Sequence, residues 1–354
     1  MHASSSIDSQ GCRLYPKRKK INKENTLIRQ SMSSTHRPVT WQGERSVLMK
    51  SLPKLAAGLG KARLSALVVT TMLAGAGMSL DPAVINADQA IKILTAGAVG
   101  TGLASASAAC LNQWLEVPFD GQMRRTQARE LPRAVGTSPP AALLTGIGWG
   151  VLGVGSLLTV NPTAASLAVL NIFLYAGVYT PLKRLTPWNT HVGAIVGAVP
   201  PLIGTALFEP DQLLSVSNLV LPAVLFAWQF PHFYALSWSR KEEYARAGYW
   251  MAAVVNPKGN RRSAFIWALM MFPICGLGAW FIDSPSFILT SAPGNVLYAW
   301  KAYSFFKDAT RTSAKSLFLT SLLHLPVTMG LLLLHRRLLF KHQDNNNRHV
   351  DIAI

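Results

Sequence analysis

The feature that most constrains this chain is a series of nine apolar segments. Each is about long enough to cross a hydrocarbon layer, which needs roughly 20 helical residues. They cover approximately residues 64–80, 91–115, 140–160, 164–182, 191–207, 213–238, 264–282, 286–306 and 315–335. Half of the residues are hydrophobic and only 14% are charged. We therefore predict an all-α polytopic membrane protein, a bundle of nine transmembrane helices.

The gaps between these segments alternate in charge. The second, fourth, sixth and eighth gaps contain lysine and arginine. The first, third, fifth and seventh contain neither, and any charges that they carry are acidic. The basic residues are Arg124, Arg125, Arg129, Arg133, Lys183, Arg184, Arg240, Lys241, Arg246, Lys258, Arg261, Arg262, Lys307 and Arg311. Positively charged loops stay on the side from which a membrane protein inserts. The even-numbered gaps are therefore expected to share one side, the mitochondrial matrix if the N-terminus is an import signal.

The N-terminal region has the composition of such a signal. Residues 1 to 63 carry 13 of the 34 lysines and arginines but only three acids, are rich in serine and lack an apolar core. This composition is typical of a mitochondrial transit peptide, although Lys17, Arg18, Lys19 and Lys20 also suit nuclear import or acidic lipid. We predict a transit peptide and disordered basic tail at 1–60, a membrane domain at 61–335, a polar C-terminal tail at 336–354, and location in the inner membrane.

The net charge of +18 is concentrated in that tail rather than on the membrane body. Basic domains often bind nucleic acid, but such binding requires a basic face on the folded domain. No nucleic-acid partner is therefore expected.

One acidic face is predicted after the second segment. Asn112, Glu116 and Asp120 are spaced four residues apart, which places all three on one side of a helix. Oxygen ligands grouped in this way suit Mg²⁺, which binds through a few carboxylates, waters and the phosphates of a substrate. The alternative interpretation is a helix end carrying solvated charges at the membrane interface.

Two arginines follow this face. Arg125 and Arg129 carry planar guanidinium groups that match phosphate oxygens. In an unbroken helix Arg125 would point away from Asp120. The helix must therefore bend or end between them, which Pro118 and Gly121 make plausible.

Two further polar clusters lie in the other basic gaps. The fourth gap contains Lys183, Arg184 and Asn189, and the sixth begins with Arg240, Lys241, Glu242 and Glu243. The charge alternation places all three clusters on one side of the membrane. Carboxylates and cations that converge over an apolar bundle predict a site for a molecule with a diphosphate head and a lipid tail.

The sequence resembles the membrane-embedded aromatic prenyltransferases related to 4-hydroxybenzoate polyprenyltransferase, and within them the branch that farnesylates protoheme IX. The resemblance covers roughly residues 61 to 335 and is carried by three stretches, NQWLEVPFDGQMRRTQAR at 112–129, YTPLKRLTPWNTHVGAIVGAVPPLIG at 179–204 and WQFPHFYALSWSRKEEYARAGYWM at 228–251. It implies nine helices around a central cavity, with two acid-rich motifs that bind Mg²⁺ and an isoprenyl diphosphate. Bacterial relatives have a third carboxylate where this chain has Pro118.

Carried over by position, the resemblance implies a role for each polar residue. The catalytic residues are Asn112, Glu116, Asp120 and Glu243. The metal ligands are Glu116, Asp120, Glu242 and Glu243. The substrate-binding residues that it implies are Arg125, Arg129, Lys183 and Arg184. The polar clusters and the histidines of the sequence add Asn189, Arg240 and His232 to this set.

The implied reaction is Mg²⁺-dependent transfer of farnesyl from farnesyl diphosphate to a vinyl group of protoheme IX, which gives heme O for heme A biosynthesis. Possible hand-over of the product to the next heme-modifying enzyme follows from the same resemblance.

Imidazoles at His191, His232 and His324 are potential iron ligands, but a lone histidine more often has a structural hydrogen bond. Three alternatives stay open from sequence, namely a prenyltransferase for a quinone precursor such as 4-hydroxybenzoate, an anion transporter and a noncatalytic assembly factor.

Overall fold

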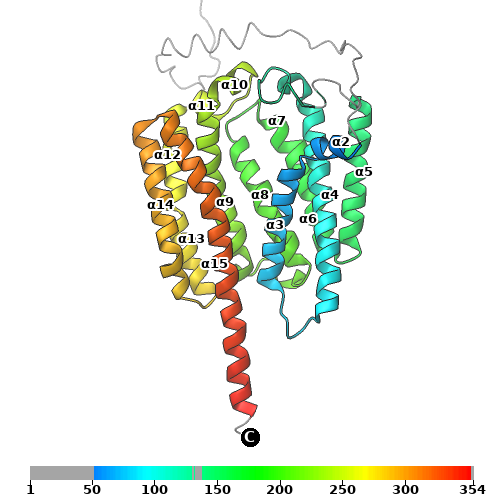
Figure 1. The fold of residues 1–354 in the computed structure, drawn as a ribbon, viewed down its shortest axis with the longest axis vertical. Helices are drawn as coiled ribbons and strands as arrows, with labels where there is room; N and C mark the ends of the chain where they lie inside the picture. Colours follow the sequence, from blue (N-terminus) through cyan, green and yellow to red (C-terminus); the bar gives the residue numbers. More distant parts are fainter. Residues whose placement is uncertain (1–51, 130, 132–137, 352–354) are drawn as a thin grey trace, which may run out of the picture. The chain divides into compact units, whose positions relative to one another are not determined.

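Every regular element in the described part of the chain, residues 52–129, 131 and 138–351, is a helix in this computed structural model (Figure 1). The all-α prediction is therefore confirmed for these residues. The predicted transit peptide at 1–60 lies mostly outside them. Its last part is described, since α2 spans Leu52–Leu59 and Leu59 is 3% exposed.

The long helices coincide with the expected segments. Seven are continuous: α3 (Ala62–Ser79), α4 (Ala87–Asp120), α5 (Pro139–Leu158), α8 (Asn189–Ala206), α9 (Val216–Ser239), α14 (Ser286–Asp308) and α15 (Arg311–Asp351). The segment expected at 164–182 is split into α6 (Pro162–Ile172), the π-helix η1 (Phe173–Tyr179) and α7 (Thr180–Leu182). The segment expected at 264–282 is split into α12 (Pro257–Leu269) and α13 (Met271–Phe281). Short helices η2 (Pro210–Gln212), α10 (Lys241–Arg246) and α11 (Ala252–Val255) lie in the connections.

Seven helical stretches among the described residues are long and apolar enough to cross a membrane: Ala62–Ser79, Ala87–Asp120, Pro139–Leu158, Pro162–Leu182, Val216–Ser239, Pro257–Phe281 and Arg311–Arg336. The two other expected segments form α8 and α14, which are 18 and 23 residues long but do not reach the same mean hydropathy. A helical membrane protein is therefore confirmed, whereas the number nine stays a prediction.

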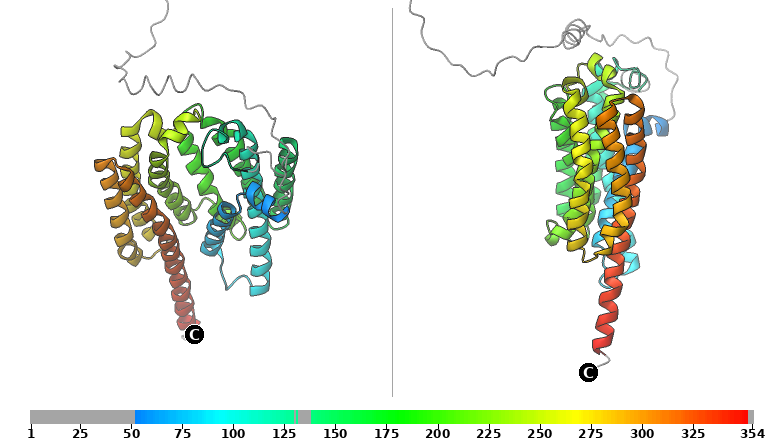
Figure 2. Two further views of the ribbon diagram at one scale, coloured as in Figure 1. Left: turned by 45° about the horizontal axis from the view of Figure 1, so that its top comes forward. Right: turned by 90° about the vertical axis from the view of Figure 1, so that its left-hand side faces the viewer.

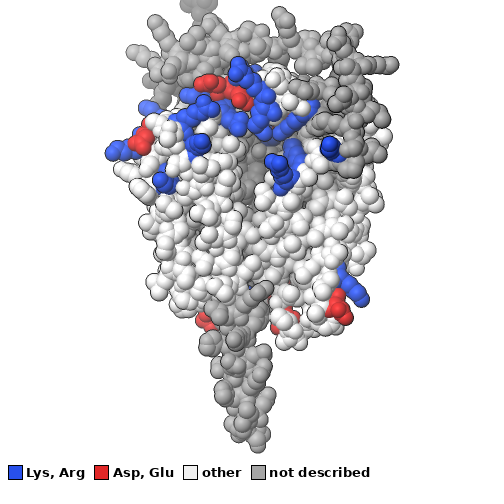
Figure 3. Space-filling model, in the orientation of Figure 1, with Lys and Arg blue, Asp and Glu red and all other residues white. Residues whose placement is uncertain are grey.

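The sides of these helices are apolar where they face outward. Trp280 is 81% exposed and Leu289 is 76% exposed, and the sides of the visible face carry almost no charge (Figure 3). An apolar surface of this extent is unfavourable in water and favourable against lipid chains. The exposed side chains therefore support the same conclusion as helix length.

Small residues allow the helices to approach closely where α3 crosses α8. A Cβ atom on Gly204 of α8 would collide with the backbone of Met72 and Ala76 on α3. Helices in lipid gain stability from this kind of close packing, because burial of apolar surface gives little advantage there. Figure 2 shows these helices within the bundle from two further directions.

The basic gaps lie at one end of the bundle. Lysine and arginine side chains gather at the end that holds α7, α10 and α11 (Figures 1 and 3). The predicted alternation of loop charge is thus matched by the fold, and the polar clusters of the even-numbered gaps are brought to a common end.

Candidate functional site

The site begins with three buried polar residues on α4. Asn112, Glu116 and Asp120 have exposed fractions of 0%, 5% and 1%, and their spacing places them on one face of the helix. The helix continues through Pro118 and ends at Asp120, with Gly121 as the following residue. The predicted helix end between Asp120 and the arginines is therefore confirmed.

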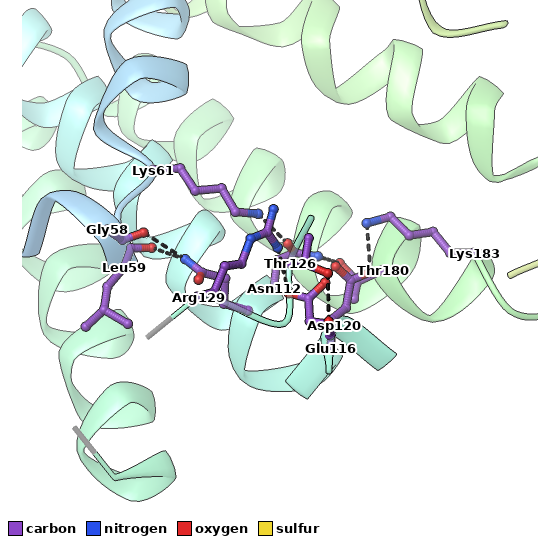
Figure 4. A network of polar contacts seen from close by, with 11 residues as sticks. Gly58, Leu59, Lys61, Asn112, Glu116, Asp120, Thr126, Arg129, Thr180 and Lys183 are labelled. Atoms are coloured by element: carbon purple, nitrogen blue, oxygen red, sulfur yellow. Dashed lines mark hydrogen bonds and ion pairs between the residues drawn. The ribbon is translucent and has the colours of Figure 1, made fainter. Parts of the chain in front are cut away.

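The chain turns back after Asp120 and returns an arginine to it. The Thr126 hydroxyl donates to the backbone carbonyl of Asp120 over 2.8 Å, and Arg129 Nη1 lies 2.6 Å from Asp120 Oδ2 (Figure 4). The Asp120 side chain is 2% exposed, and that of Arg129 is 23% exposed. Removal of one partner from a buried ion pair leaves the other charge uncompensated, so the pair holds this turn in place.

A second ion pair joins α4 to the fourth gap. Lys183 Nζ lies 2.8 Å from Glu116 Oε1, and the same ammonium lies 4.5 Å from the centre of the Tyr179 ring. Burial alone would lower the pKa of Lys183, but the Glu116 carboxylate raises that pKa well above its usual value. Lys183 is therefore a firmly charged cation in a site with little solvent.

A third cation, Lys61, contacts the polar face of α4 and comes from outside the predicted motifs. Lys61 Nζ donates to Asn112 Oδ1 over 2.6 Å, and Asn112 Nδ2 donates to the Thr180 hydroxyl over 2.9 Å (Figure 4). Burial lowers the pKa of Lys61, and the positive charges of Arg129 and Lys183 lower it further. The amide of Asn112 thus links the start of α3 to α7.

The position of Lys61 is fixed by the chain around it. Lys61 has a left-handed backbone, with φ at 47°, where α2 gives way to α3. Gln113 Nε2 donates to the carbonyls of Gly58 and Leu59, over 3.1 and 2.6 Å. Sequence reasoning missed Lys61 because it counted this lysine with the basic tail. Its position just ahead of the first apolar segment was the only available signal.

Tyr244 of α10 shows that the sixth gap reaches the same place. The side chain of Tyr244 is buried, which raises its pKa, while the positive charges of Arg125, Lys183 and Arg240 oppose that rise. These cations come from the second, fourth and sixth gaps. The charges of all three gaps therefore act on one ring, which agrees with the predicted convergence of the basic gaps.

Hydrogen bonds also connect the fourth and sixth gaps directly. The Trp250 amide donates to the Lys183 carbonyl over 2.7 Å, and Asn189 Nδ2 donates to the Trp250 carbonyl over 3.2 Å. The guanidinium carbon of Arg184 lies 4.2 Å from the centre of the Phe119 ring on α4. Asn189 is fully buried, so its amide holds the loop rather than facing solvent.

The second acidic motif contributes less to the buried cluster. Glu243 is half-buried and lies 3.9 Å from Arg240, whereas Glu242 is exposed. Arg125 is also exposed. None of these three side chains has a hydrogen bond or ion pair with Glu116 or Asp120 among the described residues.

His232 lies elsewhere, between α9 and α15. Its Nδ1 atom lies 2.7 Å from the Ser321 hydroxyl, and its ring stacks on Trp228 at 4.5 Å. His324 lies 2.9 Å from the Asn295 side chain. Both imidazoles therefore have structural partners, and their predicted roles toward a heme stay untested.

Of the four predicted metal ligands, Glu116 and Asp120 are buried, whereas Glu243 is half-buried and Glu242 is exposed. Within the described ranges no three His, Cys, Asp or Glu side chains are close enough to share a metal ion. Mg²⁺ does not require such a cluster, because it commonly takes one or two protein carboxylates and completes its shell with water and phosphate. Glu116 and Asp120, one turn apart with Asn112 beside them, fit this requirement. The full set with Glu242 and Glu243 stays a prediction.

The balance of charge favours an anionic ligand. Lys61, Lys183 and Arg129 supply three cations to the two carboxylates Glu116 and Asp120. Cations held in a poorly solvated site attract anions more strongly than they would in water.

A surface depression lined by residues of Asn86–Lys92 is not part of this site. It lies at the other end of α4, about 40 Å from the buried cluster by helix length.

Comparison with known proteins identifies the fold and the relatives. Residues 64–323 match the model of the UbiA prenyltransferase family. The chain is 39% identical over 301 residues to the mitochondrial protoheme IX farnesyltransferase of Homo sapiens, covering 83% of this chain and 65% of that protein. It is 41% identical over 282 residues to the mitochondrial protoheme IX farnesyltransferase of Arabidopsis thaliana, covering 78% of this chain and 64% of the relative. The chain thus spans about two thirds or less of these relatives' length.

Solved structures show the same fold at low identity. A digeranylgeranylglyceryl phosphate synthase superposes with a TM-score of 0.66 and 12% identity over 80% of this chain and 98% of the other. A UbiA homolog from Archaeoglobus fulgidus bound to GPP and Mg²⁺ superposes with a TM-score of 0.56 and 13% identity, over 78% and 99%.

Proposed function

Because this chain belongs to the UbiA prenyltransferase family, we propose that it transfers the farnesyl group of farnesyl diphosphate to a vinyl group of protoheme IX. The observation that carries the proposal is the buried cluster at the end of α4, where three cations meet two carboxylates. The names of the relatives supply the acceptor, and they give no support to a quinone precursor as the substrate.

The cations act on the leaving group. As the C–O bond of the allylic diphosphate breaks, negative charge grows on the diphosphate oxygens. Lys61, Lys183 and Arg129 are already fixed around this region, so they stabilise that charge without reorganising. Mg²⁺ bound with the diphosphate at Glu116 and Asp120 would supply further charge neutralisation.

The farnesyl cation completes the reaction on the acceptor. Its first carbon forms a C–C bond with the terminal vinyl carbon of protoheme, and the resulting cation takes up water and releases a proton. The product carries a hydroxyethylfarnesyl side chain, which makes it heme O. Asn112, Glu116 and Asp120 are buried, so bulk water is kept away from the farnesyl cation. Water would otherwise convert that cation to farnesol.

Localisation follows from the tail and the relatives. We propose the mitochondrial inner membrane with the basic end of the bundle toward the matrix, since both cited relatives are named mitochondrial. A reporter fused to residues 1–60 should enter mitochondria. A cytosolic or nuclear reporter would contradict the import signal. Hand-over of heme O to a following heme-modifying enzyme is part of the same proposal.

The decisive experiment is mass spectrometry of heme extracted from membranes with and without this protein. We expect heme O only when the protein and farnesyl diphosphate are both present, and about 10²-fold less heme O with Asp120→Asn. Farnesylated product on a quinone precursor, with unchanged heme, would disprove the choice of acceptor. Uptake of an anion without covalent product would favour a transporter instead.

A further inference from the structure

A buried tyrosine beside the cluster has a hydroxyl that is poorly satisfied. Tyr249 is 2% exposed, and its hydroxyl lies against the Glu116 carboxylate but forms no hydrogen bond of standard geometry with any described residue. A buried polar group without a partner is unfavourable, because it has lost its bonds to water and gained none in exchange. A hydroxyl of this kind within a binding site indicates a partner that arrives with the ligand.

The ring of Tyr249 is held firmly from several sides. It packs edge-on against Phe119 of α4 at 6.0 Å and against Tyr244 at 5.9 Å. The Tyr249 amide donates to the Tyr244 carbonyl over 3.0 Å, and the left-handed Gly248, with φ at 74°, makes this tight turn possible. The next residue, Trp250, is bonded to Lys183 through the backbone. The phenol therefore has a fixed place between α4 and the fourth gap.

The surroundings keep this phenol protonated. Burial raises the pKa of Tyr249, the Glu116 carboxylate raises it further, and the Lys183 ammonium opposes the rise. Tyr249 is consequently a neutral donor at physiological pH. Its neighbours are the two partners of the ion pair that we place at the diphosphate, so the hydroxyl lies with that part of the site.

We propose that Tyr249 is a further substrate-contacting residue, whose phenol donates a hydrogen bond to an oxygen of the diphosphate as it departs. The proposal rests on the proposed function and adds a neutral donor to the three cations. A phenol suits this task because it strengthens its hydrogen bond as charge develops on the acceptor, without adding a fourth positive charge to a cluster already rich in them.

The test removes only the hydroxyl. Tyr249→Phe keeps the ring that packs on Phe119, and Tyr298→Phe is the matched control, because Tyr298 is equally buried but donates to the Trp228 carbonyl in another part of the bundle. In purified full-length protein we would measure kcat, the KM values for farnesyl diphosphate and protoheme, and direct binding of inorganic pyrophosphate with Mg²⁺.

We expect Tyr249→Phe to lower kcat by about 10²-fold, the usual effect of losing one donor to a developing oxyanion. Pyrophosphate should bind about tenfold more weakly, since hydrogen bonds to charged groups are the stronger ones, while the KM for protoheme stays unchanged. Tyr298→Phe should change none of these values. Unchanged kcat and pyrophosphate binding in Tyr249→Phe would overturn the proposal. A raised KM for protoheme with unchanged pyrophosphate binding would overturn it in favour of a contact to a heme carboxylate.

A second variant covers the case in which Tyr249→Phe does not fold. Incorporation of 3-fluorotyrosine at position 249 alone keeps the hydroxyl and makes it more acidic, so pyrophosphate should bind more tightly, and unchanged binding would again overturn the proposal. Pyrophosphate binding also distinguishes failure of the Tyr249 proposal from failure of the proposed function. If pyrophosphate binding depends on Tyr249 but the protein forms no heme O, the diphosphate contact of Tyr249 stands and protoheme is refuted as the acceptor.

Discussion

Lys61 and Asn112 are 51 positions apart in the chain, yet the Lys61 ammonium donates a 2.6 Å hydrogen bond to the Asn112 side chain. This contact ties the turn before α3 to the face of α4 that carries Glu116 and Asp120. It also converts a lysine of the basic N-terminal region into part of a buried polar cluster, and the first two predictions follow from it.

Replacement of Lys61 should weaken binding of the diphosphate. Lys61→Met removes the charge and keeps most of the side-chain volume, and we expect the KM for farnesyl diphosphate to rise about tenfold, as for loss of a charged hydrogen bond. Lys54→Met is the matched control, since Lys54 is exposed on α2. Steady-state kinetics in detergent would measure both. Equal KM values for the two variants would contradict a role for Lys61.

Lys61 should also make stability depend on pH. Burial lowers its pKa in the folded state from the usual 10.5. Between the lowered value and 10.5 the unfolded chain binds more protons, so the free energy of unfolding rises with pH in this window. Relative to Lys61→Met, the wild-type protein should therefore gain melting temperature as the pH is raised from neutral toward 10.5. If the difference in melting temperature between the wild-type protein and Lys61→Met does not vary with pH, Lys61 does not have a lowered pKa in the folded state.

Asp120 and Glu243 should act on one metal-diphosphate unit. Asp120→Asn and Glu243→Gln keep volume and remove charge, and each should reduce transfer by on the order of 10²-fold. If the two act together, the double variant should be little worse than either single variant. Asp88→Asn, at the exposed start of α4, is the control on the same helix. Wild-type transfer with unchanged Mg²⁺ dependence in either variant would identify that acid as an interface charge.

Close packing of α3 on α8 should make Gly204 sensitive to a single methyl group. Gly204→Ala places a Cβ atom against the backbone carbonyl of Met72, and backbone atoms cannot move aside as a flexible side chain could. Overpacking of this kind typically lowers stability by about 1–3 kcal/mol. Gly155→Ala on α5 meets nothing within 4 Å and should be neutral or slightly stabilising. Thermal unfolding in detergent would compare them, and equal melting temperatures would contradict the close crossing.

The sidedness of the loops should follow their charge. Single cysteines in place of Lys258, Asp211 and Asp283 would each be exposed. In sealed inner-membrane vesicles a membrane-impermeant thiol reagent should label the first position from one side and the other two from the opposite side. Labelling of all three from one side would contradict the predicted topology.

Much of the site was accessible to sequence reasoning because it depends on local geometry. Helical spacing placed Asn112, Glu116 and Asp120 on one face, and Pro118 with Gly121 predicted a helix end, which the structure places at Asp120. The exact partners were not accessible. Arg129 rather than Arg125 bonds to Asp120, because the turn after the helix selects one side chain.

The sequence by itself determined the helical membrane fold and the common end of the basic gaps, since apolar length and loop charge act through the bilayer and need no knowledge of packing. Only the tertiary structure decided which residues meet there. Lys61 and Thr180 both bond to Asn112, Lys183 pairs with Glu116, and the Trp250 amide bonds to the Lys183 carbonyl, all through contacts between distant segments. No periodicity within a single segment encodes such contacts, because they arise from how one helix packs against another.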